Sequence, residues 1–179
     1  LFADYTFLDQ KLADHYGIPF TVDDNSVGKT KLIQGTRQYN RGGLLRQGAI
    51  LATTSAPLRT SAVKRGDWIL RRILNTPTPS PPADAGSLPS GEIVPDGKSV
   101  RERLVAHRKD PSCMNCHTKI DPLGFALENF NPIGKWRDAY LDGGAIETTG
   151  VLNDGTEIST MDDLFAYLRQ EKNTFYRNI

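Results

Sequence analysis

Two cysteines and one histidine stand in a spacing that restricts this chain more than any other feature of its sequence. Cys113 and Cys116 are separated by two residues, and His117 follows directly. Two cysteines about one helical turn apart can bond to both vinyl groups of a haem, while the adjacent imidazole ligates the iron. The chain has only 2 cysteines, so no other pair competes for this role. The motif predicts one covalently bound haem c per chain.

The same cysteines are compatible with two other chemistries. A redox disulfide of the thioredoxin type would follow a buried strand, whereas residues 106–112 are polar and turn-like. A zinc site needs four ligands, so it would have to recruit His107 or His15, and the sequence has no second close-spaced ligand pair. Covalent haem is the leading interpretation, and disulfide chemistry and zinc are its alternatives.

Length and charge limit the broad class of protein. The 179 residues, 38% of them hydrophobic, suit one ordinary domain or a small domain with appendages. A formal net charge of +1 gives no basic field of the kind that attracts nucleic acid. No apolar run approaches the roughly 18 residues of a membrane-spanning helix. We therefore expect no nucleic-acid partner and no membrane span in this segment.

Hydrophobic periodicity predicts a mainly α fold, a cytochrome c-like helical haem domain with long irregular loops and one short β-hairpin. A capping box at Ser99 and Glu102 predicts a short helix there, with Leu104 and Val105 facing the core. Helices are expected over residues 5–16, 44–53, 61–74, from 99 to about 107, at the cysteine motif, and over 161–168.

Loops and turns are indicated between these helices. Residues 21–41 are polar with scattered glycines and are expected to be extended, and the proline-rich stretch 76–98 is expected to be a linker. Residues 120–124 are expected to turn the chain directly after the motif helix. Asn153-Asp154-Gly155 predicts the turn of a hairpin within residues 146–158. Four cations are expected on a solvated face of the 61–74 helix: Lys64, Arg65, Arg71 and Arg72.

Several phrases of the sequence resemble the large planctomycete-type cytochrome proteins, whose domains are mostly of unknown function. They are residues 41–45, 60–66, the proline run, and the cysteine motif followed by the phrase over residues 120–130. Asn131 departs from the aspartate that is usual there. The resemblance implies an exported, periplasmic haem protein with neighbouring cytochrome domains or a redox partner protein. It also implies the end of a helical domain over 1–40, a haem domain over 41–142, and a truncated C-terminal domain over 143–179.

The sixth iron ligand decides what such a haem can do. His107 lies ten residues before His117, and a histidine at about this distance can reach the distal face. Met161 lies 44 residues downstream of His117, in the order that class I cytochromes c use. We expect His107 as the distal ligand with Met161 as the alternative, and His15 as a surface or core histidine.

The predicted function is single-electron transfer by one covalent haem, with the protein setting the potential. Phe125, Leu127 and Trp136 are candidates for packing against the ring. Cations near the motif could pair with the haem propionates: Arg101, Arg103, Arg108, Lys119, Lys135 and Arg137. A haem enzyme of the peroxidase or oxidase kind, with an open distal site, and a non-catalytic binding module with structural haem are the alternatives.

Overall fold

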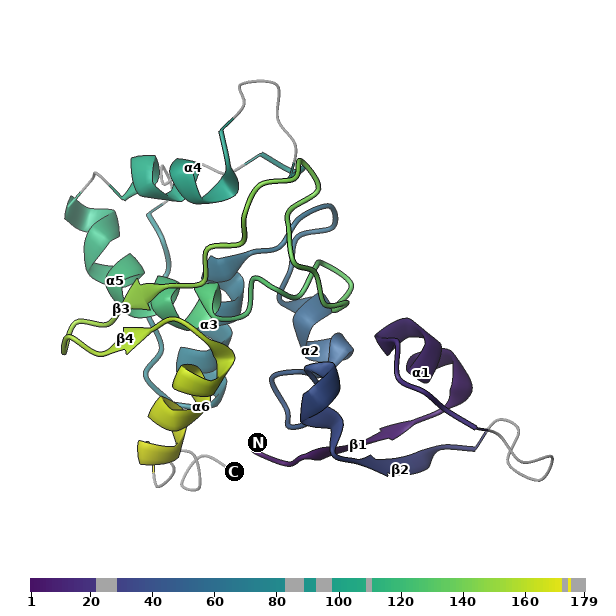
Figure 1. Cartoon of the computed structure of the whole chain (residues 1–179). Helices are drawn as coiled ribbons and strands as arrows, with labels where there is room; N and C mark the ends of the chain where they lie inside the picture. Colours follow the sequence, from purple (N-terminus) through teal and green to yellow (C-terminus); the bar gives the residue numbers. More distant parts are fainter. Residues whose placement is uncertain (22–28, 83–88, 93–97, 109–110, 172–173, 175–179) are drawn as a thin grey trace.

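The computed structural model describes residues 1–21, 29–82, 89–92, 98–108, 111–171 and 174, without the side chains of residues 100, 107 and 112. The fold is rich in helices and carries two separate two-stranded antiparallel sheets, β1 with β2 and β3 with β4 (Figure 1). The elements in chain order are β1 (Tyr5–Leu8), α1 (Gln10–Tyr16), β2 (Lys31–Gln34), η2 (Thr36–Tyr39), α2 (Gly48–Thr53), α3 (Ala62–Arg72), α4 (Val100–His107), α5 (Pro111–Phe125), β3 (Gly150–Val151), β4 (Glu157–Ile158) and α6 (Met161–Gln170).

Helices α3 and α5 form the centre of the molecule, because two glycines let their backbones approach closely. A Cβ on Gly66 of α3 would collide with the carbonyl of Ile120, and a Cβ on Gly124 of α5 would collide with the carbonyl of Ala62. The side chain of Ser61 caps α3 by accepting a hydrogen bond from the backbone N–H of Lys64. Because Gly66 and Gly124 have no side chain, α3 and α5 can lie close enough for their backbones to touch.

The main hydrophobic core surrounds this crossing and also includes the C-terminal elements. Both strands of the β3–β4 hairpin contact α5, and α6 packs against the same cluster of buried side chains (Figure 1). The predicted domain limits at residues 40 and 142 stay predictions, but the core has members on both sides of residue 142. Its buried members are Leu45, Leu51, Ile69, Leu70, Ile73, Leu74, Ile120, Leu123, Ala126, Leu127, Phe130, Leu152, Ile158, Met161, Leu164, Phe165 and Leu168.

A buried ionic network ties α3 to the loop that follows α5. Arg65, which the sequence placed on a solvated face, is 1% exposed and donates to the backbone carbonyls of Leu127 and Phe130. Its Nη1 lies 3.7 Å from Oε1 of Glu128, whose other oxygen lies 3.5 Å from Nη2 of Arg137. Burial lowers the pKa of Arg65 to about 10, Glu128 opposes that shift, and Arg137 adds to it. The prediction for Arg65 was wrong because the carbonyls it binds come from a distant part of the chain.

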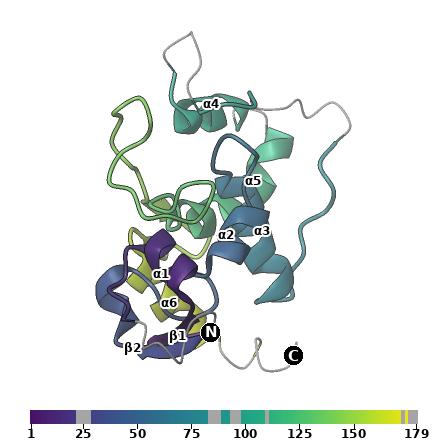
Figure 2. The same cartoon turned by 90° about the vertical axis from the view of Figure 1, so that its right-hand side faces the viewer.

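A smaller layer contains β1, β2 and α1 with its own buried cluster, and it lies beside α2 (Figures 1 and 2). The predicted helix over 5–16 is correct only in its second half. Residues 5–8 form a strand that pairs with β2, which lies inside the predicted loop over 21–41. Asp9 starts the helix, because its side chain accepts a hydrogen bond from the backbone N–H of Leu12.

The turn predicted over residues 120–124 is also absent, because α5 continues to Phe125 with Pro122 inside it. Ile120 and Leu123 are buried in the main core, and the packing of their face overrides the signals of proline and glycine. Gly150 of β3 lies directly against Pro122, where any Cβ would come within 2.6 Å of the proline Cα. Pro122 thus lies at the point where β3 carries a glycine, whose missing side chain lets the strand pack directly on the helix.

Other predictions are confirmed with small changes. Ser99 and Glu102 form a reciprocal capping box at the start of α4, and Leu104 is buried, but Val105 is 46% exposed. The hairpin turns at residues 153–155 between β3 and β4, and α6 buries the expected apolar face. The helix predicted over 44–53 begins only at Gly48. In the part of the chain that is described, no helix combines the length and apolar character needed to cross a membrane.

Candidate functional site

Helix α5 brings the three residues of the motif to one cavity. Cys113 and Cys116 are partly buried, and His117 is buried with an exposed fraction of 8%. All three line a cavity of about 220 Å³ between α5, α3 and the proline-rich segment. Residues three and four apart lie on one face of a helix, so the motif presents its thiols and imidazole together. The structure therefore places the predicted attachment and ligand residues in one site.

The wall opposite α5 is the proline-rich segment 76–82, which runs beside α3 and α5 without helix or strand (Figure 2). Thr78 anchors this segment to α3: its hydroxyl donates to Oδ1 of Asp67 over 2.6 Å, and its carbonyl accepts from Arg71 over 2.5 Å. Arg71 and Asp67 also form an ion pair of 2.6 Å. One wall of the cavity is thus rigid helix, and the other is extended chain held by a few polar contacts.

Cations stand at the edges of the site. Lys64 and Arg71 line the cavity, and Lys119 lines a second hollow of about 200 Å³ that shares Thr78 and Cys116 with the first. Lys119 was among the cations predicted to pair with haem propionates, whereas Lys64 and Arg71 were assigned to a solvated face.

Two other predicted propionate partners are engaged elsewhere. Arg101 is paired with Glu147, and Arg137 is paired with Glu92. The structure therefore keeps Lys119 as a candidate and adds Lys64, whereas Arg71 is paired with Asp67.

A buried carboxylate holds the histidine of the motif. Nδ1 of His117 lies 2.9 Å from Oδ1 of Asp121, one turn further along α5, and Asp121 is 0% exposed. A carboxylate oxygen accepts hydrogen bonds, so the Nδ1–H of His117 is the donor in this contact. Nη1 of Arg108 forms an ion pair with Oδ2 of Asp121 at 3.4 Å. Because Nδ1 is engaged by Asp121, a metal would have to be bound through Nε2.

These residues fit a covalently attached haem. Covalent attachment requires two thiols about one turn apart, and ligation of the iron requires an imidazole, which is fixed here through Nδ1. Oδ2 of Asp121 is buried and accepts no hydrogen bond within the described residues. A cation beyond the imidazole would offset this buried negative charge, because charges interact strongly where water is excluded. The two thiols with the imidazole, and the buried carboxylate that Arg108 compensates only at 3.4 Å, both suit a histidine-ligated iron.

The structure places the three histidine and methionine candidates for the distal position in different surroundings. His107 is the last residue of α4, and its side chain lies outside the described part of the structure. Met161 is 7% exposed, belongs to the main core, and is absent from the lining of the cavity that contains His117. Nε2 of His15 lies 2.8 Å from the carbonyl oxygen of Ile133. The identity of the distal ligand stays a prediction.

The residues expected to pack on the ring lie in three places. Phe125 belongs to a small buried cluster with Leu104, and the guanidinium of Arg101 lies 4.1 Å above its ring. Leu127 is in the main core, while Trp136 is partly exposed and donates from Nε1 to Asp138. None of the three lines the cavity beside the cysteines as the described residues define it.

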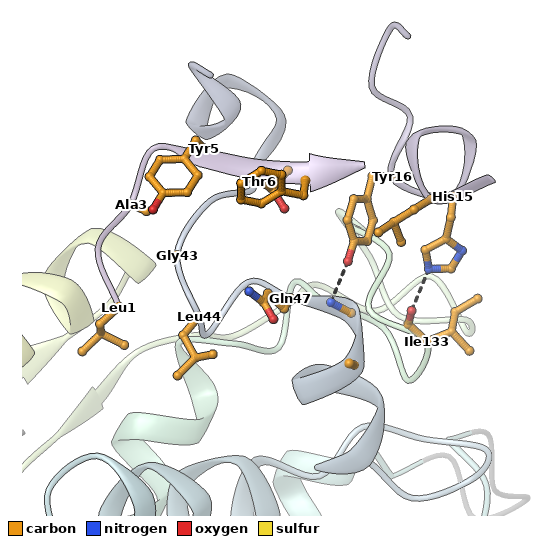
Figure 3. Close-up of a pocket in the computed structure, with 14 residues that line it drawn as sticks. Leu1, Ala3, Tyr5, Thr6, His15, Tyr16, Gly43, Leu44, Gln47 and Ile133 are labelled. Atoms are coloured by element: carbon orange, nitrogen blue, oxygen red, sulfur yellow. Dashed lines mark hydrogen bonds between the residues drawn. The ribbon is translucent and has the colours of Figure 1, made fainter. Parts of the chain in front are cut away.

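A larger cavity lies away from the motif. It measures about 560 Å³ between the β1–α1 layer and α2 (Figure 3). Tyr16 and His15 cross from α1 to the opposite wall, where Tyr16 accepts a hydrogen bond from the backbone N–H of Gly48 over 2.8 Å. The expected surface or core role of His15 agrees with this position, because the histidine holds the layer to the loop at Ile133.

A disulfide and a zinc site were the alternatives to haem attachment at the two cysteines. Cys113 and Cys116 are not joined in a disulfide. Within the described ranges, no three side chains of the His, Cys, Asp and Glu types come together as a metal-binding group.

Sequence reasoning missed Asp121, which it had placed in a turn. The spacing of four residues from His117 was visible, but it brings the two side chains together only if the helix continues through Pro122. A carboxylate four residues after a potential ligand histidine was therefore the available signal.

Comparison with known proteins gives one match. The family model described as "PSCyt3: Protein of unknown function (DUF1588)" matches residues 41–140, which is more than half of the chain. The matched region contains α2 to α5, the proline-rich segment and the cysteine motif. No curated protein and no solved structure matches the chain.

Proposed function

The chain belongs to the PSCyt3 (DUF1588) family, a planctomycete cytochrome-type family of unknown function, and we propose that it carries one covalent haem c for single-electron transfer. The observation that carries this proposal is the meeting of both cysteines and the histidine at one cavity. Haem attachment of this type is completed on the exported side of the membrane, so the proposed location is the periplasm or its equivalent. The proposed partners are a redox protein or neighbouring cytochrome domains.

Each residue of the site has a defined part in this proposal. Cys113 and Cys116 bind the cofactor covalently, and His117 binds its iron from the proximal side. Asp121 keeps the proton on Nδ1 of His117 and fixes the orientation of the ring. The bound haem supplies a one-electron couple at its iron. Lys64 and Lys119 offer positive charge beside the site for the carboxylates of such a group.

Removal of both thiols tests the attachment. In Cys113→Ala/Cys116→Ala, made in a host with a functional haem-attachment system, we expect complete loss of haem that survives denaturing electrophoresis. Met114→Ala lies inside the motif, and Met114 is 48% exposed, so this control should retain the haem. Haem staining of the gel and the absorption spectrum measure both. A wild-type protein without covalent haem under these conditions would refute the proposal.

Two single substitutions test the distal ligand. We expect His107→Ala to convert the oxidised iron from low spin to high spin, and Met161→Leu to leave the spectrum unchanged. Leucine preserves most of the volume of Met161, so the core should tolerate this change. Electron paramagnetic resonance and binding of carbon monoxide to the reduced form provide the readout. The opposite pattern would make Met161 the ligand, and high-spin wild-type iron would favour the haem-enzyme alternative.

A further inference from the structure

We infer that Asp121 is a positioning residue that lowers the reduction potential of the site through His117, and that Arg108 moderates this effect. The inference rests on the proposed haem attachment and goes beyond it, because it assigns the residues that tune the iron. Asp121 contacts His117 directly and Arg108 contacts Asp121, yet neither residue belongs to the cysteine motif.

The position of Asp121 follows from the continuation of α5. The helix runs through Pro122 to Phe125, so residues 117 and 121 lie one turn apart on one face. The resulting distance of 2.9 Å from Nδ1 to Oδ1 is that of a good hydrogen bond. Had the chain turned at residue 120, this carboxylate would not reach the imidazole. The unbroken helix therefore builds the contact.

Burial makes this carboxylate electrostatically effective. Its side chain is fully buried, and its second oxygen accepts no hydrogen bond within the described residues. Within the described residues, Arg108 pairs with that oxygen from the C-terminal cap of α4 at 3.4 Å, which is long for a charge-assisted hydrogen bond. The side chain of Arg108 is 25% exposed, so water screens part of its charge. Most of the influence of Asp121 is thus directed at the ring of His117.

The sign of the effect follows from charge. A hydrogen bond from Nδ1–H to a carboxylate makes the imidazole a stronger donor, which favours the more positive, oxidised iron. The buried negative charge favours the same state through space. Loss of the charge of Asp121 should therefore raise the reduction potential, and loss of the charge of Arg108 should lower it.

The other charged groups of the cavity do not substitute for Asp121. Lys64, Asp67 and Arg71 line the cavity from α3, where Asp67 and Arg71 neutralise each other in an ion pair. Lys64 donates to the carbonyl of Ser55 over 3.4 Å. Of these four described side chains, Asp121 is the one that hydrogen-bonds to the imidazole of His117.

The test compares reduction potentials of the haem-loaded protein by spectroelectrochemistry. Asp121→Asn keeps the shape of the side chain and removes its charge, and it should shift the reduction equilibrium at least about tenfold toward the reduced form, about 59 mV. Arg108→Ala should shift the potential in the opposite direction by a smaller amount. Asp14→Asn, an exposed carboxylate on α1, is the charge-matched control and should leave the potential unchanged.

The outcomes separate this inference from the proposed function. An Asp121→Asn protein that retains covalent haem at the wild-type potential would overturn the inference and leave the haem proposal intact. Absence of covalent haem from the wild-type protein would refute the haem proposal itself. If Asp121→Asn fails to fold, Arg108→Ala decides: a lowered potential supports the inference, and an unchanged or raised potential overturns it.

Discussion

Gly124→Ala is expected to lower the free energy of unfolding by about 3 kcal/mol or more. The added Cβ would meet the backbone carbonyl of Ala62, which cannot rotate away as the end of a side chain can. Relief would require α3 and α5 to separate, and both helices contribute to the main core. Overpacking of a core commonly costs about 1–3 kcal/mol, and this clash between backbones should reach at least the upper end of that range. Chemical denaturation followed by circular dichroism measures the loss.

Gly17→Ala is the matched control for the glycine substitution. Gly17 ends α1 with a φ of 68°, and nothing lies within 4 Å of an added Cβ. Alanine there should cost only the strain of a left-handed conformation, about 1–2 kcal/mol. Equal losses for the two variants would mean that the helices yield easily and that Gly124 does not set their distance.

Glu128→Gln is expected to produce the second large loss of stability. Glu128 is 3% exposed and accepts a hydrogen bond of 2.6 Å from the hydroxyl of Thr60. Its charge is the nearest compensation for Arg65, whose side chain is 0% exposed. Removing one partner of a buried ion pair costs about 3–5 kcal/mol, because the remaining charge cannot reach water. The free energy of unfolding in urea provides the measurement.

A double-mutant cycle separates this interaction from general damage to the core. Glu128→Gln combined with Arg65→Met should cost less than the sum of the two single substitutions, by about 1 kcal/mol or more. Glu157→Gln alters an exposed carboxylate and should change stability by less than about 0.5 kcal/mol. Strict additivity of the two buried substitutions would show that Arg65 does not depend on Glu128.

Helix caps and tight turns could be predicted from the sequence, because each depends only on residues that are close together in the chain. The capping box at Ser99 and the turn at residues 153–155 both act within four residues, and both appear in the structure. The strand over residues 5–8 was missed because its partner lies about 25 residues away. A strand that depends on a distant partner leaves a weaker pattern in its own sequence.

The candidate site divides in the same way. The cysteines and His117 could be identified from the sequence because haem attachment requires that spacing. The structure adds the cavity that they share. Asp121 was not recognised as a partner, because proline and glycine nearby indicated a turn that packing against α3 overrides. Lys64 and Arg71 are exposed as predicted, but the sequence does not show that the proline-rich segment lies with them around one cavity.

The main core extends past residue 142, so a fragment that is to keep this core intact must include those residues. The family match ends at residue 140, yet Leu152, Ile158 and Leu164 are buried against side chains that lie inside the match. A fragment cut at the end of the match would expose that apolar surface to water and would tend to aggregate. Recombinant work on the haem motif therefore needs the chain through the end of α6 at Gln170.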